Sequence, residues 1–305
     1  VIYEKRAYTW KETRERCVRI ASSLKNFGVK PGDTVSVLAF NTPEMFESHF
    51  SIPMTGAILN TINIRLDAQT IAYIFDDSNA KILFVDRELF SVASEALAIA
   101  SVSPKIIVIN DSYAFSQPDI SSDTIDYESL VDNGDPLYNW KMPGDEWSPL
   151  SLSYTSGTTG KPKGVVYHHR GSYLMSMGTV VGWNLPSHPV YLYSVPLFHC
   201  NGWGHAWTMA ALAGTIICLR SFEPEKVFSL LNEHRVTHFG GAPIMLNMLA
   251  NAPKEEQKSF EREIQVMTAG APPPAKVLES MMALGFNVMH VYGLTETYGH
   301  ILQAA

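Results

Sequence analysis

The chain has 305 residues and a formal net charge of −7. A chain of this length can bury roughly three quarters of its unfolded surface, in one large domain or two smaller ones. The acidic balance argues against a nucleic-acid-binding surface, which needs a basic field. The 17% of charged residues, against about 25% in ordinary domains, indicates extensive burial.

The first part of the chain alternates between predicted helices and strands. Residues 1–10 are expected to form a strand, and Thr9 can cap the helix that follows and stops at Gly28. Pro43 and Asp67 open two further helices. The helix capped by Thr9 is predicted over 11–27. Another helix is predicted at 91–100, and strands are predicted at 34–40, 80–86 and 104–110. The strands are continuous apolar runs, which is typical of a parallel sheet covered on both faces.

Residues 111–149 are rich in Ser, Asp, Pro and Gly and are predicted to be an irregular excursion or linker. After it the alternation resumes, with strands expected at 190–198, 215–220, 237–243, 264–270 and 287–293. The sequence therefore predicts an α/β fold of two βαβ-type lobes. These lobes cover approximately residues 1–110 and 150–305.

The remaining bulk features restrict the class of protein further. Cys17, Cys200 and Cys218 are an odd, scattered set, which is typical of buried thiols in a reducing compartment and not of a disulfide framework. The apolar run 206–219 is too short to cross a bilayer, and no signal peptide is recognisable. Because the chain opens inside a predicted strand and stops soon after a motif, we expect it to be a fragment.

One stretch, YTSGTTGKPKG (154–164), has the composition of a phosphate-binding loop. It is not a Walker A loop, since Gly157 and Gly160 are too close together and Pro162 disfavours helical geometry at Lys161. Nor is it a Rossmann fingerprint, since GxGxxG is absent. The residues on both sides are strand-like, so we expect a hairpin whose amides, hydroxyls and two ammonium groups cover a polyphosphate and release pyrophosphate. The alternative is a solvated hairpin with lysines for solubility.

Three segments in this order resemble one known family. Tyr154–Gly164 looks like the phosphate loop of the adenylate-forming, AMP-binding superfamily, Gly270–Val277 like its adenine-pocket segment, and Val291–Thr297 like its YGxTE block. The likeness covers almost the whole chain and implies the large N-terminal domain of such an enzyme. The sequence FHCNGW, from Phe198 to Trp203, is most similar to the corresponding segment of short- and medium-chain acyl-CoA ligases, including the methylmercaptopropionate type.

The resemblance also implies roles for individual residues. Lys163, His199, Thr295 and Glu296 would be catalytic, and Glu296 and Thr155 would hold Mg²⁺. The acyl substrate would contact His199, Trp203, Gly270, Gly293 and Leu294. The nucleotide would contact Thr155, Ser156, Gly157, Thr158, Thr159, Gly160, Lys163, Gly270, Ala271, Pro272, Tyr292, Gly293 and Thr295. Read without the family, the Gly270 turn and the Tyr292 ring could be an ordinary turn and a core side chain.

No Asp, Glu, Lys or Arg occurs between Gly171 and Leu219. Most of this segment must form a buried layer of sheet and helix, and part of it could line an acyl pocket. The ammonium group of an amino acid substrate would find no carboxylate in this segment, and a buried ammonium group without a counter-charge is costly. We therefore expect a plain carboxylic acid as substrate and not an amino acid. A His199–Cys200 nucleophilic pair is disfavoured because strand neighbours point to opposite faces, and His199 with His205 lack the partners of a zinc site.

Together these features predict an ATP-dependent acyl-CoA ligase that forms an acyl-AMP and then a CoA thioester, with ATP, Mg²⁺ and coenzyme A. A non-catalytic nucleotide-binding module, an adenylation domain that loads a carrier protein and, less favoured, a phosphotransferase stay open. Complete family members carry a ribose-binding Asp and a C-terminal lysine after the YGxTE block, so residues 1–305 alone should show negligible turnover. We expect no integral membrane contact and a cytoplasmic location, or a peroxisomal one if a C-terminal signal follows. Whether the protein forms a homodimer stays open.

Overall fold

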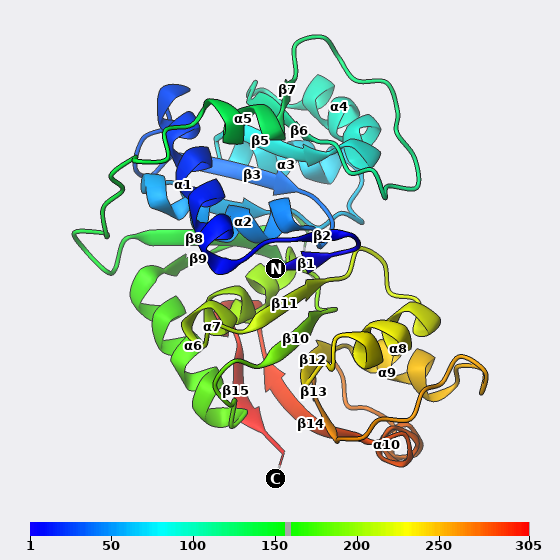
Figure 1. Ribbon diagram of the computed structural model, residues 1–305. Coiled ribbons are helices and arrows are strands. Elements are labelled where there is room, and N and C mark those ends of the chain that lie inside the picture. The colour runs from blue at the N-terminus through cyan, green and yellow to red at the C-terminus, as the bar shows by residue number, and fades with distance from the viewer. Residues whose placement is uncertain (156–159, 305) are drawn as a thin grey trace. The chain divides into compact units, whose positions relative to one another are not determined.

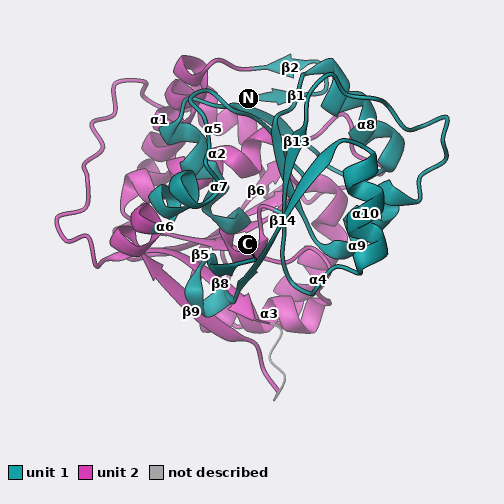
Figure 2. Ribbon diagram, turned by 90° about the horizontal axis from the view of Figure 1, so that it is seen from below, with its two compact units in different colours: residues 1–7, 175–196, 202–305 teal, residues 8–174, 197–201 magenta. Residues whose placement is uncertain are grey.

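The computed structural model describes residues 1–155 and 160–304 (Figure 1). It divides into two compact units, each built on its own sheet (Figure 2). Unit 1 consists of Val1–Ala7, Met175–Pro196 and Gly202–Ala305, and unit 2 of Tyr8–Leu174 and Leu197–Asn201. The predicted α/β class is confirmed. Among the described residues, none of the helices has the length and apolar character of a membrane-spanning segment.

Unit 2 contains a seven-stranded sheet in the order β7-β6-β5-β3-β4-β8-β9. Its neighbours pair in parallel except β8 and β9, which are antiparallel. The strands are β3 (Thr34–Leu38), β4 (Ile58–Thr61), β5 (Ala80–Asp86), β6 (Lys105–Ile109), β7 (Ile125–Asp126), β8 (Pro149–Thr155) and β9 (Lys163–His168). Every residue of β3 is buried, as expected of a strand covered on both faces. The sheet therefore positions the hairpin that carries the phosphate-loop sequence at its edge.

Three helices of unit 2 begin where the sequence predicted. Asp67 caps α3 through the Thr70 amide, and Pro43 begins α2. The helices are α1 (Trp10–Asn26), α2 (Pro43–Ser51), α3 (Ala68–Asp77), α4 (Phe90–Ile99) and α5 (Tyr127–Asn133), with short 3₁₀ turns η1 (Pro53–Thr55) and η2 (Arg87–Leu89). Local signals thus predicted the starts of α1, α2 and α3, whereas α5 lies in the stretch that was expected to be irregular.

A capping box fixes the start of α1. The Thr9 side chain accepts from the Glu12 amide at 3.2 Å, and the Glu12 carboxylate accepts from the Thr9 amide at 2.7 Å. We expect Thr9→Ala to lower the free energy of unfolding by about 1 kcal/mol, because it leaves a helix N–H without its partner. Urea denaturation measures this, with Thr9→Ser, which keeps the hydroxyl, as the matched control. Equal midpoints for Thr9→Ala and Thr9→Ser would refute the assignment.

Unit 1 contains an eight-stranded sheet in the order β15-β14-β13-β12-β10-β11-β1-β2. Strands from β14 to β1 run parallel, while β15 and β2 close the two edges antiparallel. The strands are β1 (Ile2–Tyr3), β2 (Arg6–Ala7), β10 (Val190–Tyr193), β11 (Thr215–Cys218), β12 (His238–Gly241), β13 (Ile264–Thr268), β14 (Phe286–Gly293) and β15 (His300–Gln303). The single strand expected over residues 1–10 is therefore wrong: two short strands turn at Glu4, which has a φ of 50°.

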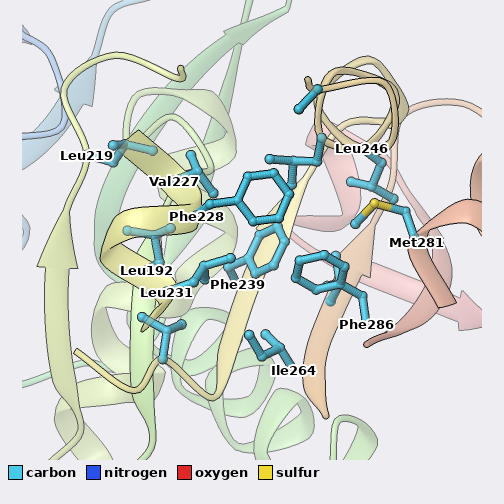
Figure 3. Packing of buried hydrophobic residues seen from close by; sticks show 14 of the residues in the cluster. Leu192, Leu219, Val227, Phe228, Leu231, Phe239, Leu246, Ile264, Met281 and Phe286 are labelled. Carbon is cyan, nitrogen blue, oxygen red and sulfur yellow. The ribbon is translucent and has the colours of Figure 1, made fainter. Parts of the chain in front are cut away.

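The helices of unit 1 cover an apolar core on this sheet. The helices that contribute to this core are α8 (Pro224–Glu233), α9 (Pro243–Ala250) and α10 (Ala275–Ala283). Helix α7 (His205–Ala211) and the 3₁₀ turn η4 (Thr295–Thr297) belong to the same unit, and in sequence α6 (His169–Gly182) and η3 (His199–Gly204) begin in unit 2 and end in unit 1. Figure 3 shows Phe228 from α8, Phe239 from β12 and Phe286 from β14 directed toward one another. All three are at most 2% exposed. With Ile264 and Val266 of β13, they form a core that joins α8 to the neighbouring strands β12, β13 and β14.

The predicted lobes, 1–110 and 150–305, do not coincide with the two units. Residues 149–155 form β8 and residues 163–168 form β9, and β8 pairs with β4 in the sheet of unit 2. Residues 111–149, predicted as a linker, remain in unit 2 and contain β7 and α5. There the Ser23 hydroxyl donates to the Leu130 carbonyl at 2.7 Å. The boundary depends on pairing between strands some ninety residues apart, which no local pattern encodes.

Candidate functional site

The phosphate-loop sequence joins the antiparallel strands β8 and β9, as predicted. Thr155, at the end of β8, pairs with Lys163, at the start of β9, and Lys163 is exposed. Gly160 has a φ of +135°, a conformation that disfavours side chains, and open space around it. Ser156, Gly157, Thr158 and Thr159 lie outside the described residues. Lys163 and Thr155 therefore lie directly opposite each other at the ends of the two strands that the loop joins.

This hairpin is fixed to α3 of the same unit. The Tyr154 hydroxyl donates to Asp77 Oδ2 at 2.7 Å, and the Tyr73 hydroxyl donates to Asp77 Oδ1 at 3.3 Å. Burial, together with the Asp77 carboxylate, raises the pKa of Tyr154, so the donor stays protonated. Lys161 Nζ lies 5.2 Å from the centre of the Tyr73 ring, within cation–π range. Of the two lysines, Lys161 is thus engaged with α3, and Lys163 is the better candidate for phosphate.

The segment that carries His199 has a geometry that differs from the prediction. Residues 190–198 were expected to be one strand, but β10 ends at Tyr193 and η3 begins at His199. Cys200 Sγ consequently lies 3.9 Å from both ring nitrogens of His199, so the argument from opposite strand faces is wrong. Cys200 is only 8% exposed, which disfavours it as a nucleophile for another reason.

His199 itself is exposed at the end of this segment. Desolvation by the surrounding protein and, secondly, the positive charge of Arg65 lower the pKa of His199. The imidazole is therefore neutral at pH 7, so it can accept or donate a hydrogen bond without adding a positive charge.

In unit 1, two of the motifs lie at the carboxyl ends of neighbouring parallel strands. The register pairs Thr268 of β13 with His290 of β14, so Gly270 and Tyr292 each follow the paired residues by two positions. Gly270 has a φ of +97° and open space where a Cβ would lie. Tyr292 is 52% exposed, so its ring does not belong to the core. Ligands of parallel α/β sheets bind at this kind of edge.

The residues after Tyr292 form a tight turn. A side chain at Gly293 would overlap the Gly299 carbonyl oxygen, so this close approach of two backbone segments requires glycine. The Thr297 hydroxyl accepts from the Leu294 amide at 2.9 Å, and η4 then holds Thr295 and Glu296. Leu294 and Glu296 are exposed, together with Ala271 and Pro272 on the neighbouring loop. The sheet thus brings both motifs to one edge of unit 1.

The Glu296 carboxylate can serve Mg²⁺ chemically. Mg²⁺ is held by one or two carboxylates together with phosphate oxygens and waters, so a dedicated protein cage is not needed. Within residues 1–155 and 160–304, no group of three His, Cys, Asp or Glu side chains forms such a cage. A site completed by substrate phosphates therefore fits the residues present.

Trp203 is supported by a neutral aromatic layer within unit 1 that the sequence did not reveal. Its ring lies 5.9 Å from His205, whose Nδ1 is 2.6 Å from the Tyr191 hydroxyl. Burial lowers the pKa of His205 to about 3, so this ring stays uncharged. A Cβ at Gly240 would lie 2.7 Å from Val195 Cγ2 and 3.4 Å from the Trp203 ring, so glycine is needed here. The surroundings of Trp203 suit an uncharged ligand group.

The family comparison agrees with this arrangement. The AMP-binding enzyme family matches residues 1–305, and the chain belongs to that family. The resemblance predicted from the three motifs is therefore confirmed.

Individual relatives are acyl-activating enzymes. The chain is 45% identical to the 2-methylpropanoate–CoA ligase CCL4 of Humulus lupulus, over 100% of this chain and 55% of that protein. It is 44% identical to the peroxisomal acetate/butyrate–CoA ligase AAE7 of Arabidopsis thaliana, over 98% of this chain and 54% of that protein. The chain spans about half the length of the curated relatives it matches.

Solved structures agree in fold. O-succinylbenzoate coenzyme A synthetase of Bacillus subtilis, in complex with AMP, is 25% identical with a TM-score of 0.82, over 100% of this chain and 58% of that one. The anthranilate CoA ligase AuaEII, in complex with anthranoyl-AMP, has a TM-score of 0.86 at 21% identity, over 99% of this chain and 58% of that one, which shows the fold alone.

Proposed function

We propose that the full-length protein carrying this chain is an AMP-forming acyl-CoA ligase for a short- or medium-chain carboxylic acid. The observation that carries the proposal is the edge of unit 1, where the Gly270 turn and the Tyr292–Glu296 segment follow adjacent parallel strands. The plant relatives, named as ligases of 2-methylpropanoate and of acetate or butyrate, support the same reaction class.

The first step would join acid and nucleotide. A carboxylate oxygen of the acid attacks the α-phosphorus of ATP, the bond to the β-phosphate oxygen breaks, and pyrophosphate leaves. Lys163 would neutralise the departing phosphates, and the Thr295 hydroxyl would donate to a phosphate oxygen. Glu296, with Thr155 as a second oxygen ligand, would hold Mg²⁺, which when bound neutralises phosphate charge.

The second step would transfer the acyl group. The coenzyme A sulfur, after losing its proton, attacks the acyl carbon, and the bond to the AMP oxygen breaks. The neutral His199 and the half-buried Trp203 would flank the acyl end, and both suit a substrate that brings no charge besides its carboxylate. Gly270, Gly293 and Leu294 would complete the acyl contacts.

We expect Tyr292→Ala to raise the KM for ATP about tenfold, because base–aromatic stacking is worth about 1–3 kcal/mol. The half-exposed ring is available for this contact at the end of β14. Tyr292→Phe keeps the ring and should stay close to wild type. Steady-state kinetics with ATP varied at saturating acid measures both variants, and an unchanged KM in Tyr292→Ala would exclude stacking.

The function itself is tested by product analysis. The full-length protein is incubated with ATP, Mg²⁺, coenzyme A and a panel from acetate to cinnamate, and the products are identified by mass spectrometry. Acyl-CoA with equimolar AMP supports the proposal. ADP would indicate a phosphotransferase, and acyl-AMP without thioester would indicate delivery to a carrier protein.

Location and assembly stay predictions. The Arabidopsis relative is named peroxisomal, which is compatible with a peroxisomal location if a C-terminal signal is present, and otherwise we propose the cytoplasm. Whether the protein forms a homodimer stays an open prediction. In the product analysis, a non-catalytic module would bind nucleotide without forming product.

A further inference from the structure

The segment around His199 has an unusual backbone. Cys200, Asn201 and Trp203 have φ values of 42°, 39° and 57°, and the glycines between and after them are also positive at 62° and 71°. Residues other than glycine rarely adopt this left-handed backbone conformation, and several in succession are rarer still. Such a turn persists only where the surrounding structure holds it, and strained segments of this kind gather at functional sites.

Buried hydrogen bonds of unit 2 hold the first part of this turn. Asn201 is fully buried, and its Nδ2 donates to Thr61 Oγ1 at 2.8 Å while its Oδ1 accepts from Ser151 Oγ at 2.6 Å. Thr61 ends β4 and Ser151 lies on β8, the next strand of the sheet. The side chain of Asn201 is thus fixed to two adjacent strands.

The backbone before His199 is held by the same unit. Thr61 Oγ1 donates to the Phe198 carbonyl at 2.9 Å, and the Leu197 amide donates to Asn41 Oδ1 at 2.8 Å. The fully buried His49 lies close to the backbone of Leu197 and Asn201, and its Nδ1 is 2.9 Å from the Met45 carbonyl oxygen.

The bonds leave one side chain of the segment directed outward. Residues 197, 198 and 201 are bonded on either side of His199, and the ring of His199 remains exposed. Thr61 joins the two sides, because one hydroxyl accepts from Asn201 and donates to Phe198. If Thr61 and Asn201 had only a structural role, their hydrogen bonds would do no more than satisfy buried polar groups. Because the bonds lie on both sides of His199, they also fix the direction of its Cα–Cβ bond.

We propose that Asn201 and Thr61 are positioning residues that hold His199 toward the acyl end of the substrate. This inference rests on the proposed function, since it assigns His199 to the acid and not to ATP. Loss of the Thr61 hydroxyl should therefore impair use of the acid while leaving nucleotide binding unaffected, because its hydroxyl bonds join Phe198 and Asn201, neither of which is assigned to ATP.

The test compares Thr61→Val, which removes the hydroxyl at nearly constant volume, with Thr61→Ser, which keeps it, in the full-length protein. We expect Thr61→Val to lower kcat/KM for the acid at least about tenfold, with the KM for ATP within about twofold of wild type. Thr61→Ser should restore most of the activity. Asn201→Gly, which favours the left-handed backbone but lacks both side-chain bonds, should behave like Thr61→Val and serves if Thr61→Val does not fold.

A second readout does not depend on activity. NMR of histidine ring protons, with the His199 signal identified by its loss in His199→Gln, reports the His199 titration. In Thr61→Val its midpoint should move toward that of an unperturbed histidine, since the ring leaves its present surroundings. A folded Thr61→Val whose acid kcat/KM or His199 titration matches wild type would overturn the proposal. A wild-type protein without acyl-CoA synthesis would overturn the proposed function instead, while the NMR comparison still decides the positioning.

Discussion

Replacing Glu296 with glutamine in the full-length protein is expected to lower the rate of acyl-adenylate formation by about two to three orders of magnitude. Glutamine keeps the size and one oxygen but removes the negative charge that a hard divalent cation requires. Glu296 lies exposed in η4, immediately after the Gly293 turn that fixes its backbone. Single-turnover formation of acyl-AMP, followed by rapid quench, measures the effect.

Glu279→Gln is the matched control for Glu296. Glu279 is an exposed glutamate on α10 of the same unit, outside both strand-end motifs. This control should keep the wild-type rate. Raising the Mg²⁺ concentration should recover part of the Glu296→Gln rate if the loss is in cation binding. A Glu296→Gln enzyme as fast as the control would remove Glu296 from the site.

Lys163→Ala is expected to lower the same rate by about two orders of magnitude, because a charge-assisted contact to the departing phosphates is lost. Lys163 begins β9, opposite Thr155, and is exposed. Pre-steady-state release of pyrophosphate measures the change. Pyrophosphate release should fall in parallel with acyl-AMP formation.

Two other lysines calibrate this loss. Lys141→Ala removes an exposed ammonium group from an irregular stretch and should have no effect. Lys161→Ala should have a smaller effect than Lys163→Ala, because Lys161 lies over the Tyr73 ring. If Lys161→Ala proved the more damaging change, the assignment of the two lysines would have to be reversed.

Much of the fold was predictable because its signals are local. The capping residues Thr9 and Asp67 and the opening Pro43 each mark the start of a helix at the observed position. The apolar runs before Gly270 and Tyr292 are strands, and the motifs lie at or just after their carboxyl ends. These features depend on side chains only a few residues apart, so the sequence alone contains them.

Other features depend on contacts between distant residues. β4 is only four residues long and was not predicted, although it pairs with both β3 and β8. The bonds of Thr61 to Phe198 and Asn201 span more than 130 positions of sequence. Periodicity cannot reveal such contacts, and for this reason the residues that hold His199 were missed.

The turn after Phe198 is an intermediate case. The sequence Asn201-Gly202 is typical of left-handed turns, and Gly204 follows closely, so a turn signal was present. The apolar residues before it favoured a continuous strand, and that interpretation was wrong from Ser194 onward. The sequence therefore predicts which residues form this motif, but not the turn that they adopt.

Isotope exchange between ATP and pyrophosphate by the full-length protein tests the central claim most directly, because it follows reversal of the adenylation step without requiring coenzyme A. The account predicts exchange that depends on an added acid such as 2-methylpropanoate or butyrate and that is strongly reduced in Glu296→Gln and Lys163→Ala. Exchange that is absent with every acid, or that proceeds equally well in both variants, would contradict it.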